Sequence, residues 1–205
     1  MNKDLHILGL TGGIATGKST CVGVFRELLP EVVVFDADAS VRSLYEDQSI
    51  LTELLRYFGP DALLEDGSGN KSYLRRRAFS EASDKRFLEQ LFHGRVREDC
   101  LALLAQTVTK GVSRLFVADV PLLFENGFDF GQSANLLVAT SRKTQVDRLT
   151  QRNKWDQDMV QAVLASQMPI EAKHALADVV FWNEGPLEML RKQCFRHLQA
   201  LGLLR

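Results

Sequence analysis

Residues 9–20 read GLTGGIATGKST, and this glycine-rich segment constrains the fold more than any other part of the sequence. From Gly12 onward it has the spacing of a phosphate-binding P-loop, a glycine and four further residues followed by Gly17, Lys18 and Ser19. Glycines let successive backbone N–H groups turn toward one anion, and the positive end of the following helix strengthens the binding. A P-loop joins a buried strand to a helix, so this segment predicts a phosphate-binding βα unit.

The flanking residues fit this prediction. Leu5–Leu10 is typical of a buried strand, and apolar residues recur at helical spacing from Ser19 to Pro30. A simple glycine turn is the alternative, but the position between strand and helix favours nucleotide binding. We expect Lys18 to contact the outer phosphates and Ser19 to hold Mg²⁺. The expected nucleotide-binding residues are Gly13, Ile14, Ala15, Thr16, Gly17, Lys18, Ser19 and Thr20.

Four more apolar runs predict the remaining strands of a parallel sheet. They are Val32–Phe35, Leu115–Val120, Ala134–Ala139 and Val179–Trp182. Helical patterning separates them, and strands that alternate with helices indicate an α/β fold with right-handed crossovers. Ligands of such folds bind at the carboxyl ends of the strands. We therefore expect a five-stranded parallel sheet with its site at that edge.

The stretch between the second and third strands is too long for one crossover helix. Its pattern is mostly helical, with breaks at Gly59-Pro60 and at EDGSGN, residues 65–70. We expect a nucleotide-binding core of residues 1–38 and 112–205, with a small lid at about 148–160. Residues 39–111 are expected to form a helical subdomain that binds the phosphate acceptor.

Composition excludes several other classes of protein. The 25 Lys and Arg against 26 Asp and Glu give a net charge of −1, which argues against general binding to nucleic acid or anionic membranes. No apolar run is long enough to span a bilayer, and MNKDLHILGL is a poor signal peptide. The three cysteines are widely spaced without a CxxC pair, which favours free thiols. We expect a cytoplasmic protein that is a monomer or a weak oligomer.

Two carboxylates follow the second strand. The segment VVVFDADASVR places Asp36 and Asp38 at the carboxyl end of that strand. A carboxylate there can orient an acceptor hydroxyl, or take its proton, during in-line attack on the γ-phosphate. The alternative is that Asp38 caps a helix beginning at Ala39. The residues alone leave both interpretations open.

Four blocks of the sequence together resemble the dephospho-CoA kinase family. They read LTGGIATGKST, FDADASVR, VPLLFENG and ASQMPIEAKHALADVVFWNEG, in the order and spacing of that family from about Leu8 to Leu190. The resemblance implies a P-loop kinase that transfers the γ-phosphate of ATP to the 3′-hydroxyl of dephospho-CoA, giving CoA and ADP in the last step of coenzyme A biosynthesis. It further implies that Asp38 is the catalytic base and contacts the acceptor.

The third block begins at the end of a strand. Asp119 could reach Mg²⁺ through water or could serve as a structural hydrogen-bond acceptor. The resemblance implies an acceptor side lined by Pro121, Leu122, Leu123 and Glu125, although the leucines are equally typical of a core. His93 either contacts the acceptor or packs. Gly94 replaces the proline that follows this histidine in the family, so we expect an altered hinge between helices.

Basic residues precede the last strand. Arg148 and Arg152 are four apart, so both can face one oxygen-rich anion from a single helical face. A solvated helix face is the usual alternative. The resemblance implies that these two are catalytic lid arginines that close over the ATP phosphates. It also places Asn183, in the closing N-x-G block, near the adenine of ATP, whereas a simple strand-to-helix turn is the alternative.

The P-loop departs from the family pattern G-G-I-G-S-G-K-S. Ala15 and Thr16 replace its third glycine and its serine. Alanine disfavours positive φ, so we expect the loop to keep its shape if φ at Ala15 is negative, and Ala15 is the first place to look for an altered backbone.

Two other functions fit a P-loop. One is a kinase for a nucleoside, a nucleotide or a sugar acid, and the other is a GTPase-like switch. NKWD at 153–156 spells a guanine-recognition pattern, but it follows a basic helix and not a buried strand, so it does not favour the switch. The basic run Arg75–Arg77 cannot share one helical face, and surface solvation is favoured over acceptor binding there.

Overall fold

The computed structural model describes residues 5–205, except for the side chain of Asn153, the first residue of the NKWD segment. Residues 1–4 of the expected core therefore lie outside the described residues. The chain forms two compact units, one extending to Phe35 and resuming at Leu103–Arg205, the other comprising Asp36–Ala102. The expected core, residues 1–38 and 112–205, has its first boundary three residues later and its second boundary nine residues later than these units. One long helix, Ala82–Lys110, crosses the second boundary, so its last residues, from Leu103 onward, belong to the first unit.

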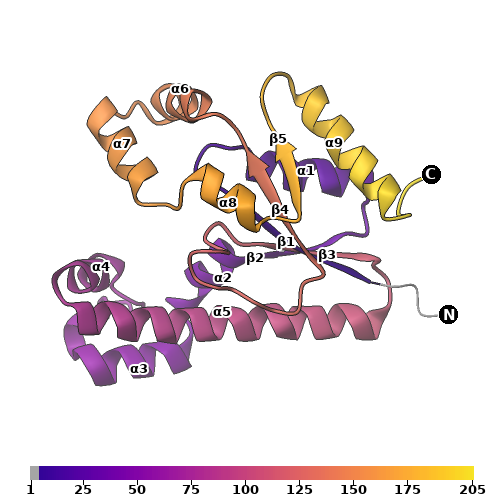
Figure 1. Cartoon of the computed structure of the whole chain (residues 1–205). Helices are drawn as coiled ribbons and strands as arrows, with labels where there is room; N and C mark the ends of the chain where they lie inside the picture. The colour runs from indigo at the N-terminus through magenta and orange to yellow at the C-terminus, as the bar shows by residue number, and fades with distance from the viewer. Residues whose placement is uncertain (1–4) are drawn as a thin grey trace. The chain divides into compact units, whose positions relative to one another are not determined.

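A five-stranded parallel sheet in the order β2-β3-β1-β4-β5 forms the centre of the first unit (Figure 1). The strands are β1 (His6–Gly12), β2 (Val33–Asp36), β3 (Leu115–Asp119), β4 (Ala134–Ala139) and β5 (Val179–Trp182). All five coincide with predicted apolar runs, to within one or two residues at their ends. β1 is central and pairs with β3 and β4, and Leu10 and Val117 are completely buried. Burial on both faces explains why these strands are continuously apolar.

Helices α1 (Lys18–Leu28) and α9 (Leu187–Ala200) lie side by side along the sheet (Figure 1). Their apolar faces form the main core, where Phe25 of α1 meets Phe181 of β5. Cys21 and Cys194 also meet there, with their sulfur atoms 3.8 Å apart. This contact and burial raise the pKa of the Cys21 thiol. All three cysteines are free, as expected, and all three are buried.

Three further helices lie between β4 and β5, namely α6 (Arg142–Asn153), α7 (Gln157–Ala165) and α8 (Ile170–Leu176). Leu149, Val160 and Leu164 form a small apolar cluster of their own between α6 and α7, here called the lid cluster. Ile14 and Ala15 of the P-loop pack against it. The expected lid therefore has a core of its own, and two P-loop side chains reach that core.

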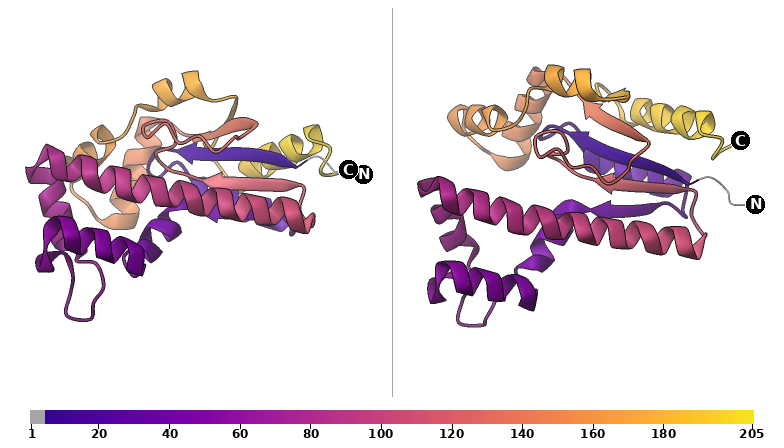
Figure 2. Two further views of the ribbon diagram at one scale, coloured as in Figure 1. Left: turned by 90° about the horizontal axis from the view of Figure 1, so that it is seen from below. Right: turned by 60° about the horizontal axis from the view of Figure 1, so that its bottom comes forward.

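The second unit is helical, as predicted. It contains α2 (Ala37–Leu44), α3 (Gln48–Phe58), a short 3-10 turn (Pro60–Ala62), α4 (Lys71–Ser80) and most of α5 (Ala82–Lys110). The breaks fall at Gly59-Pro60 and near 65–70, where turn residues were noted. Both views of Figure 2 show α3 and α4 beside the same end of α5. The rings of Tyr57 and Phe87 stack there, with centroids 3.9 Å apart.

Helix α5 runs unbroken through His93 and Gly94. The expectation of a hinge at this point is therefore wrong. Gly94 is exposed, and a Cβ added there would have no neighbour within 4 Å. A helix tolerates such a glycine at a cost of about 1 kcal/mol relative to alanine, and tertiary packing on either side of it keeps the helix continuous.

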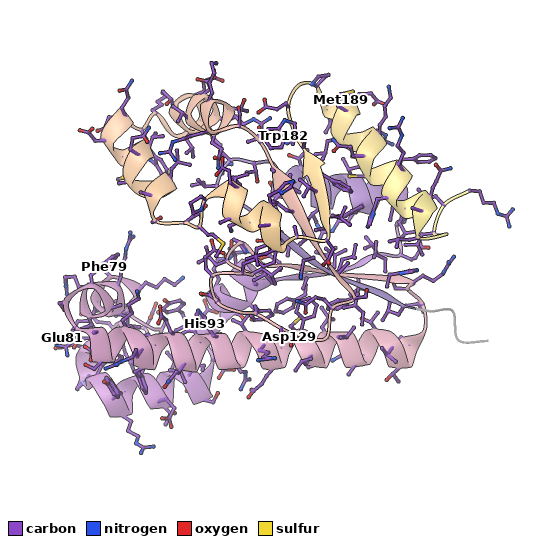
Figure 3. All side chains as sticks on the ribbon, viewed as in Figure 1. Phe79, Glu81, His93, Asp129, Trp182 and Met189 are labelled. Atoms are coloured by element: carbon purple, nitrogen blue, oxygen red, sulfur yellow. The ribbon has the colours of Figure 1, made fainter. Side chains whose placement is uncertain are left out.

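The outer edge of the sheet is β5, and α9 covers part of it. The side-chain amide of Gln193 accepts a hydrogen bond from the Trp182 N–H (2.9 Å) and donates one to the Trp182 carbonyl (3.1 Å). Figure 3 labels Trp182 at the end of β5 and Met189 on α9. Both side chains are about half exposed. Among the helices of residues 5–205, none has the length and apolar character needed to cross a membrane.

Candidate active site

The P-loop leads from β1 into α1 and holds a set of available backbone N–H groups. Thr16 is completely buried, and its hydroxyl donates to the Gly13 carbonyl across the loop (2.8 Å). Gly17 precedes α1 with φ of +96°. Within residues 5–205, no acceptor is found for the N–H groups of five P-loop residues, which are Ala15, Gly17, Lys18, Ser19 and Thr20. Such a run of donors at a helix N-terminus is suited to phosphate.

Ala15 has φ of +61°, so the condition of a negative φ at this position is not met. An L-residue in this left-handed region costs about 1–2 kcal/mol, because its Cβ approaches the following carbonyl oxygen. The surroundings offset the cost. The Ala15 carbonyl accepts a hydrogen bond from Arg148 (3.0 Å), and its methyl group packs on the lid cluster. The family's glycine would adopt this conformation without strain.

Two glutamines hold the backbone of Ile14. The Gln145 side chain donates to the Ile14 carbonyl (2.7 Å), and the Gln167 side chain accepts from the Ile14 N–H (2.8 Å). The Ile14 N–H is thus engaged by protein and does not belong to the available donors, so the expected nucleotide-binding role of Ile14 remains a prediction. Neither glutamine was identified from the sequence. Gln167 lies in the last resemblance block, whereas nothing in the sequence marks Gln145.

Arg148 is turned toward the P-loop. One terminal nitrogen donates to the carbonyls of Ala15 and Thr16 (3.0 and 3.3 Å), and the other donates to the carbonyl of Asn183 (3.0 Å). Both terminal nitrogens are therefore engaged by backbone. The expected pairing of Arg148 with Arg152 on one phosphate-facing side is revised, since the guanidinium of Arg148 is committed to the loop.

Arg152 differs from Arg148 in its surroundings. It is exposed in the last turn of α6, directly before the left-handed cap at Lys154. No hydrogen bond or ion pair joins its guanidinium to the described residues. This arginine is therefore available to an anionic ligand.

Asn183 braces the loop from β5. Its side-chain amide is buried and donates to the Thr16 carbonyl (2.8 Å). A Cβ at Gly17 would lie 2.2 Å from that amide nitrogen. Glycine is thus required at position 17 both for its positive φ and for space. The expected role of Asn183 near adenine remains a proposal, while its observed partner is the loop.

The neighbouring Glu184 anchors the start of α6. Its carboxylate accepts from the Ser141 N–H (2.6 Å) and from the hydroxyls of Thr140 and Thr144 (2.8 and 2.7 Å). These bonds, above all the one from Ser141, lower the pKa of Glu184 to about 2. The turn after β5 is thereby fixed to α6 and, through Asn183, to the P-loop. The sequence did not single out Glu184.

Lys18 and Asp119 form an ion pair at the ends of α1 and β3. β1 and β3 are adjacent, so the last residue of β3 lies beside the loop that follows β1. Both side chains are mostly buried. Of the two roles considered for Asp119, the structure shows the carboxylate as a partner of the P-loop lysine.

The oxygen donors near this pair fit a magnesium ion. Within residues 5–205 no group of three or more Asp, Glu, His or Cys side chains is arranged for a metal, so no site is made by protein alone. Ser19 presents an exposed hydroxyl in the first turn of α1, and Asp119 presents a carboxylate. Mg²⁺ prefers a few such oxygen ligands combined with substrate phosphates and water. The donor set therefore suits an ion that arrives with a nucleotide.

Asp36 caps α2, and Asp38 does not. The Asp36 carboxylate accepts from the Ala39 N–H (2.8 Å), and the helix begins at Ala37. The capping interpretation of Asp38 is therefore wrong. Asp38 is exposed in the first turn of α2, and among the described residues its carboxylate has no hydrogen-bond partner. Its side chain is available for chemistry.

The expected acceptor-side residues have different environments. Leu123 is only 1% exposed and packs in the core near Gly9, so its assignment to the acceptor is wrong. Pro121 and Leu122 are partly exposed. His93 is half-buried on α5 in the second unit, as labelled in Figure 3.

Glu125 and Lys173 form a buried ion pair that the sequence did not predict. Their charged atoms are 2.8 Å apart, and the Lys173 side chain is completely buried. Lys173 also donates to the Pro121 carbonyl (3.0 Å), which accepts a second bond from the Thr11 hydroxyl (3.0 Å). Glu125 accepts from the Met168 N–H (3.1 Å). The pair ties the segment after β3 to the start of α8.

A cavity of about 230 Å³ opens beside the P-loop in the first unit. Gly13 forms one wall, and the segment between α7 and α8 forms the opposite one. Its polar lining includes Arg142, Gln145, Gln167 and Glu171.

Comparison with known proteins gives a consistent result. A family model described as dephospho-CoA kinase matches residues 6–188. A dephospho-CoA kinase of Aggregatibacter actinomycetemcomitans is 37% identical over 183 residues, covering 89% of this chain and 86% of that protein. The crystal structure of a Thermus thermophilus protein is similar, with a TM-score of 0.80 and 32% identity over 97% of this chain and 98% of that one. A dephospho-CoA kinase from Campylobacter jejuni shares the fold, with a TM-score of 0.64 and 22% identity over 96% and 97% of the two chains.

Proposed function

Because the chain belongs to the dephospho-CoA kinase family, an ATP-dependent group of enzymes of CoA biosynthesis, we propose how its own residues transfer the γ-phosphate of ATP to the 3′-hydroxyl of dephospho-CoA. The observation that carries the donor half is the set of available N–H groups of Ala15 and of residues 17–20, which includes Lys18. These groups hold the phosphates of ATP, and Lys18 turns from Asp119 toward the outer phosphates.

Ser19 and Asp119 would hold Mg²⁺ together with phosphate oxygens. The ion, when bound, neutralises charge on the phosphates as the γ-phosphoryl group leaves. The chain's own contribution is to aim the Ser19 hydroxyl from the first turn of α1 and to retain Asp119 at the end of β3. Asp119 therefore holds Lys18 in position in the absence of nucleotide.

Asp38 is proposed as the catalytic base. Its carboxylate accepts the proton of the 3′-hydroxyl while the ribose oxygen forms a bond to the γ-phosphorus. The bond between that phosphorus and the β–γ bridging oxygen breaks, and ADP leaves with the bridging oxygen. Support comes from the position of Asp38 two residues after β2 and from its lack of a capping role.

Arg152 is proposed as the lid arginine that stabilises the charge on the transferred group. Exposure and the lack of an intramolecular partner among the described residues suit this role. Arg148 is assigned a different part, because it holds the loop carbonyls that fix the direction of the phosphate-binding N–H groups. Asn183 shares that part through its bond to Thr16, beside the site proposed for adenine.

The segment after β3 is proposed to contact the acceptor. Pro121 and Leu122 offer partly exposed apolar surface for the pantetheine arm, and Glu125 fixes that segment. His93 is proposed to contact the acceptor from α5. The net charge of −1 supports a protein that does not bind nucleic acid. We further propose that it acts on its small-molecule substrate in the cytoplasm, as a monomer or a weak oligomer.

A substrate panel tests this function. ADP release from ATP would be followed with dephospho-CoA, nucleoside monophosphates, pantothenate and gluconate as acceptors. We expect release only with dephospho-CoA, and its loss in Lys18→Ala. A thermal shift with ATP but not GTP is expected in parallel, and a shift with GTP alone would favour the switch. Turnover of a sugar acid or a nucleotide in place of dephospho-CoA would overturn the proposal.

A further inference from the structure

We propose that Gln145 and Gln167 are positioning residues for phosphoryl transfer, because together they tie the tip of the P-loop to both ends of the α6–α7 hairpin. The inference rests on the proposed function, since it concerns the site that holds the ATP phosphates. It assigns a role to two uncharged side chains that touch no expected substrate group and act through the backbone of Ile14.

The two bonds have opposite polarity. The Ile14 carbonyl can only accept, so Gln145 presents its NH₂ group to it (2.7 Å). The Ile14 N–H can only donate, so Gln167 presents its oxygen (2.8 Å). The orientation of each side-chain amide is thus fixed by its partner. Consecutive peptide groups of the loop are held from two sides.

The two glutamines come from opposite ends of one hairpin. Gln145 lies in the first turns of α6, before the lid cluster residues, and Gln167 follows the end of α7. Ile14 is the common partner of both. A displacement of either helix therefore changes the position of Ile14, unless one of the bonds breaks.

Packing reinforces the same link. Ile14 and Ala15 contact the lid cluster with their apolar side chains. Ala15 keeps a left-handed conformation that alanine disfavours, so surrounding contacts must hold it. The Ala15 N–H is one of the donors proposed to bind phosphate, and it belongs to the same peptide group as the Ile14 carbonyl that Gln145 holds. The glutamines thus determine where a phosphate-binding donor points.

Four variants test the proposal through the polarity of the bonds. Gln145→Met and Gln167→Met keep the length of the side chain and remove the amide. Gln167→Glu keeps an acceptor for the Ile14 N–H, whereas Gln145→Glu replaces the required donor by a carboxylate facing a carbonyl. Both Glu variants add the same negative charge near the phosphates, so their difference reports hydrogen bonding. Gln151→Met, at an exposed position of α6, is the matched control.

Each variant would be characterised by the KM for ATP, the KM for dephospho-CoA, kcat and amide hydrogen exchange of the nucleotide-free protein. We expect the KM for ATP to rise about fivefold in each Met variant, the factor that corresponds to one hydrogen bond. The KM for dephospho-CoA should stay unchanged. Gln145→Glu should have at least fivefold higher KM for ATP than Gln167→Glu. The Thr16 amide, which donates to the Gly13 carbonyl, should exchange faster in the Met variants.

Equal KM values for ATP in the two Glu variants would overturn the proposal, as would wild-type KM values and exchange in both Met variants. The comparison of the Glu variants remains decisive if a Met variant unfolds. Hydrogen exchange is measured without nucleotide or dephospho-CoA, so it tests the role of the glutamines independently of the proposed function. The two proposals can fail separately. If the wild-type protein does not phosphorylate dephospho-CoA, the proposed function is contradicted. If the Met variants still lose P-loop protection from exchange, the positioning role of the two glutamines is supported.

Discussion

The ammonium group of Lys173 lies 2.8 Å from the carboxylate of Glu125, and the lysine side chain is completely shielded from solvent. The second oxygen of Glu125 is also buried, and within residues 5–205 it has no hydrogen-bond partner. A buried charge that loses its partner is strongly destabilising, whereas a well-packed apolar replacement of both partners is often tolerated.

We therefore expect Lys173→Met to lower the free energy of unfolding by about 3 kcal/mol. The double variant Lys173→Met with Glu125→Leu should recover most of that loss, because no charge is then left unpaired. Urea unfolding of the two variants and of Glu125→Leu alone measures the coupling. Additive losses would show that the two side chains do not depend on each other.

Asp38→Asn should lower kcat about a hundredfold or more, since the amide cannot accept the proton of the 3′-hydroxyl. The Kd for ATP should not change. Asp36→Asn is the matched control, because asparagine caps a helix as well as aspartate does. It should retain wild-type kcat. An unchanged kcat in Asp38→Asn would remove this residue from the role of base.

Substitution of Arg148 and of Arg152 on α6 should change different quantities: stability and the KM for ATP for the first, and kcat for the second. Arg148→Ala removes three bonds to loop and turn carbonyls, so we expect lower stability and a higher KM for ATP. Arg148→Lys should rescue little, because an ammonium group cannot span the same acceptors. Arg152→Ala should change the free energy of unfolding by less than about 0.5 kcal/mol.

Arg152→Ala should instead lower kcat, by about a hundredfold if the charge acts in the transition state. Steady-state kinetics and thermal unfolding of both variants make the comparison. An effect of Arg152→Ala limited to the KM for dephospho-CoA would place this residue on the acceptor side.

Acid should remove the contribution of Glu184 within a defined range of pH. The pKa of Glu184 is about 2 in the folded protein and about 4.5 in the unfolded chain, so the unfolded state binds the proton more readily. Its stabilisation is fully present above pH 4.5 and declines as the pH falls toward 2.

At neutral pH, Glu184→Gln should be less stable than the wild type by about 1 kcal/mol, the lower range for bonds to a charged group near solvent. This difference should shrink between pH 4.5 and 2. Urea unfolding at a series of pH values measures it, and a difference independent of pH would contradict the assignment.

The conformation of Ala15 can be tested with two substitutions. Ala15→Gly gains from relief of the positive φ but loses a methyl contact and gains freedom in the unfolded chain, so the free energy of unfolding should change by less than about 1 kcal/mol. Ala15→Val places a β-branched residue in the left-handed region and should destabilise by about 2 kcal/mol or more. Equal stability of the Val and Gly variants would contradict the observed φ.

The strands could be predicted because buried parallel strands leave continuous apolar runs. The P-loop was recognised because its spacing follows from phosphate binding. The role of Asp38 as base remains a prediction that comes from the family resemblance. The cap of α2 was considered at Asp38, but the structure has it two residues earlier, at Asp36, because both aspartates occupy positions that suit a cap. The left-handed φ of Ala15 was also missed, because the contacts that sustain it come from α6, more than a hundred residues away.

Other parts of the site have no local signature. Gln145 and Gln167 each make one bond to a backbone group, and such a bond leaves no periodicity in the sequence. Lys173 is a polar residue in a short helix, and only its distant partner Glu125 explains its burial. Arg148 and Arg152 were grouped because they share a helical face, yet one lies over the P-loop and the other lies at the end of α6.

Gln193 covers the backbone of the edge strand β5 at Trp182. Its side-chain amide carries the same donor and acceptor as a peptide group, and it satisfies both backbone groups of Trp182. At Trp182 the side chain of Gln193, on α9, therefore makes the two hydrogen bonds that a peptide group of a sixth strand would make. Exposed strand edges are templates for pairing with other chains, and this amide leaves neither backbone group of Trp182 open to such pairing.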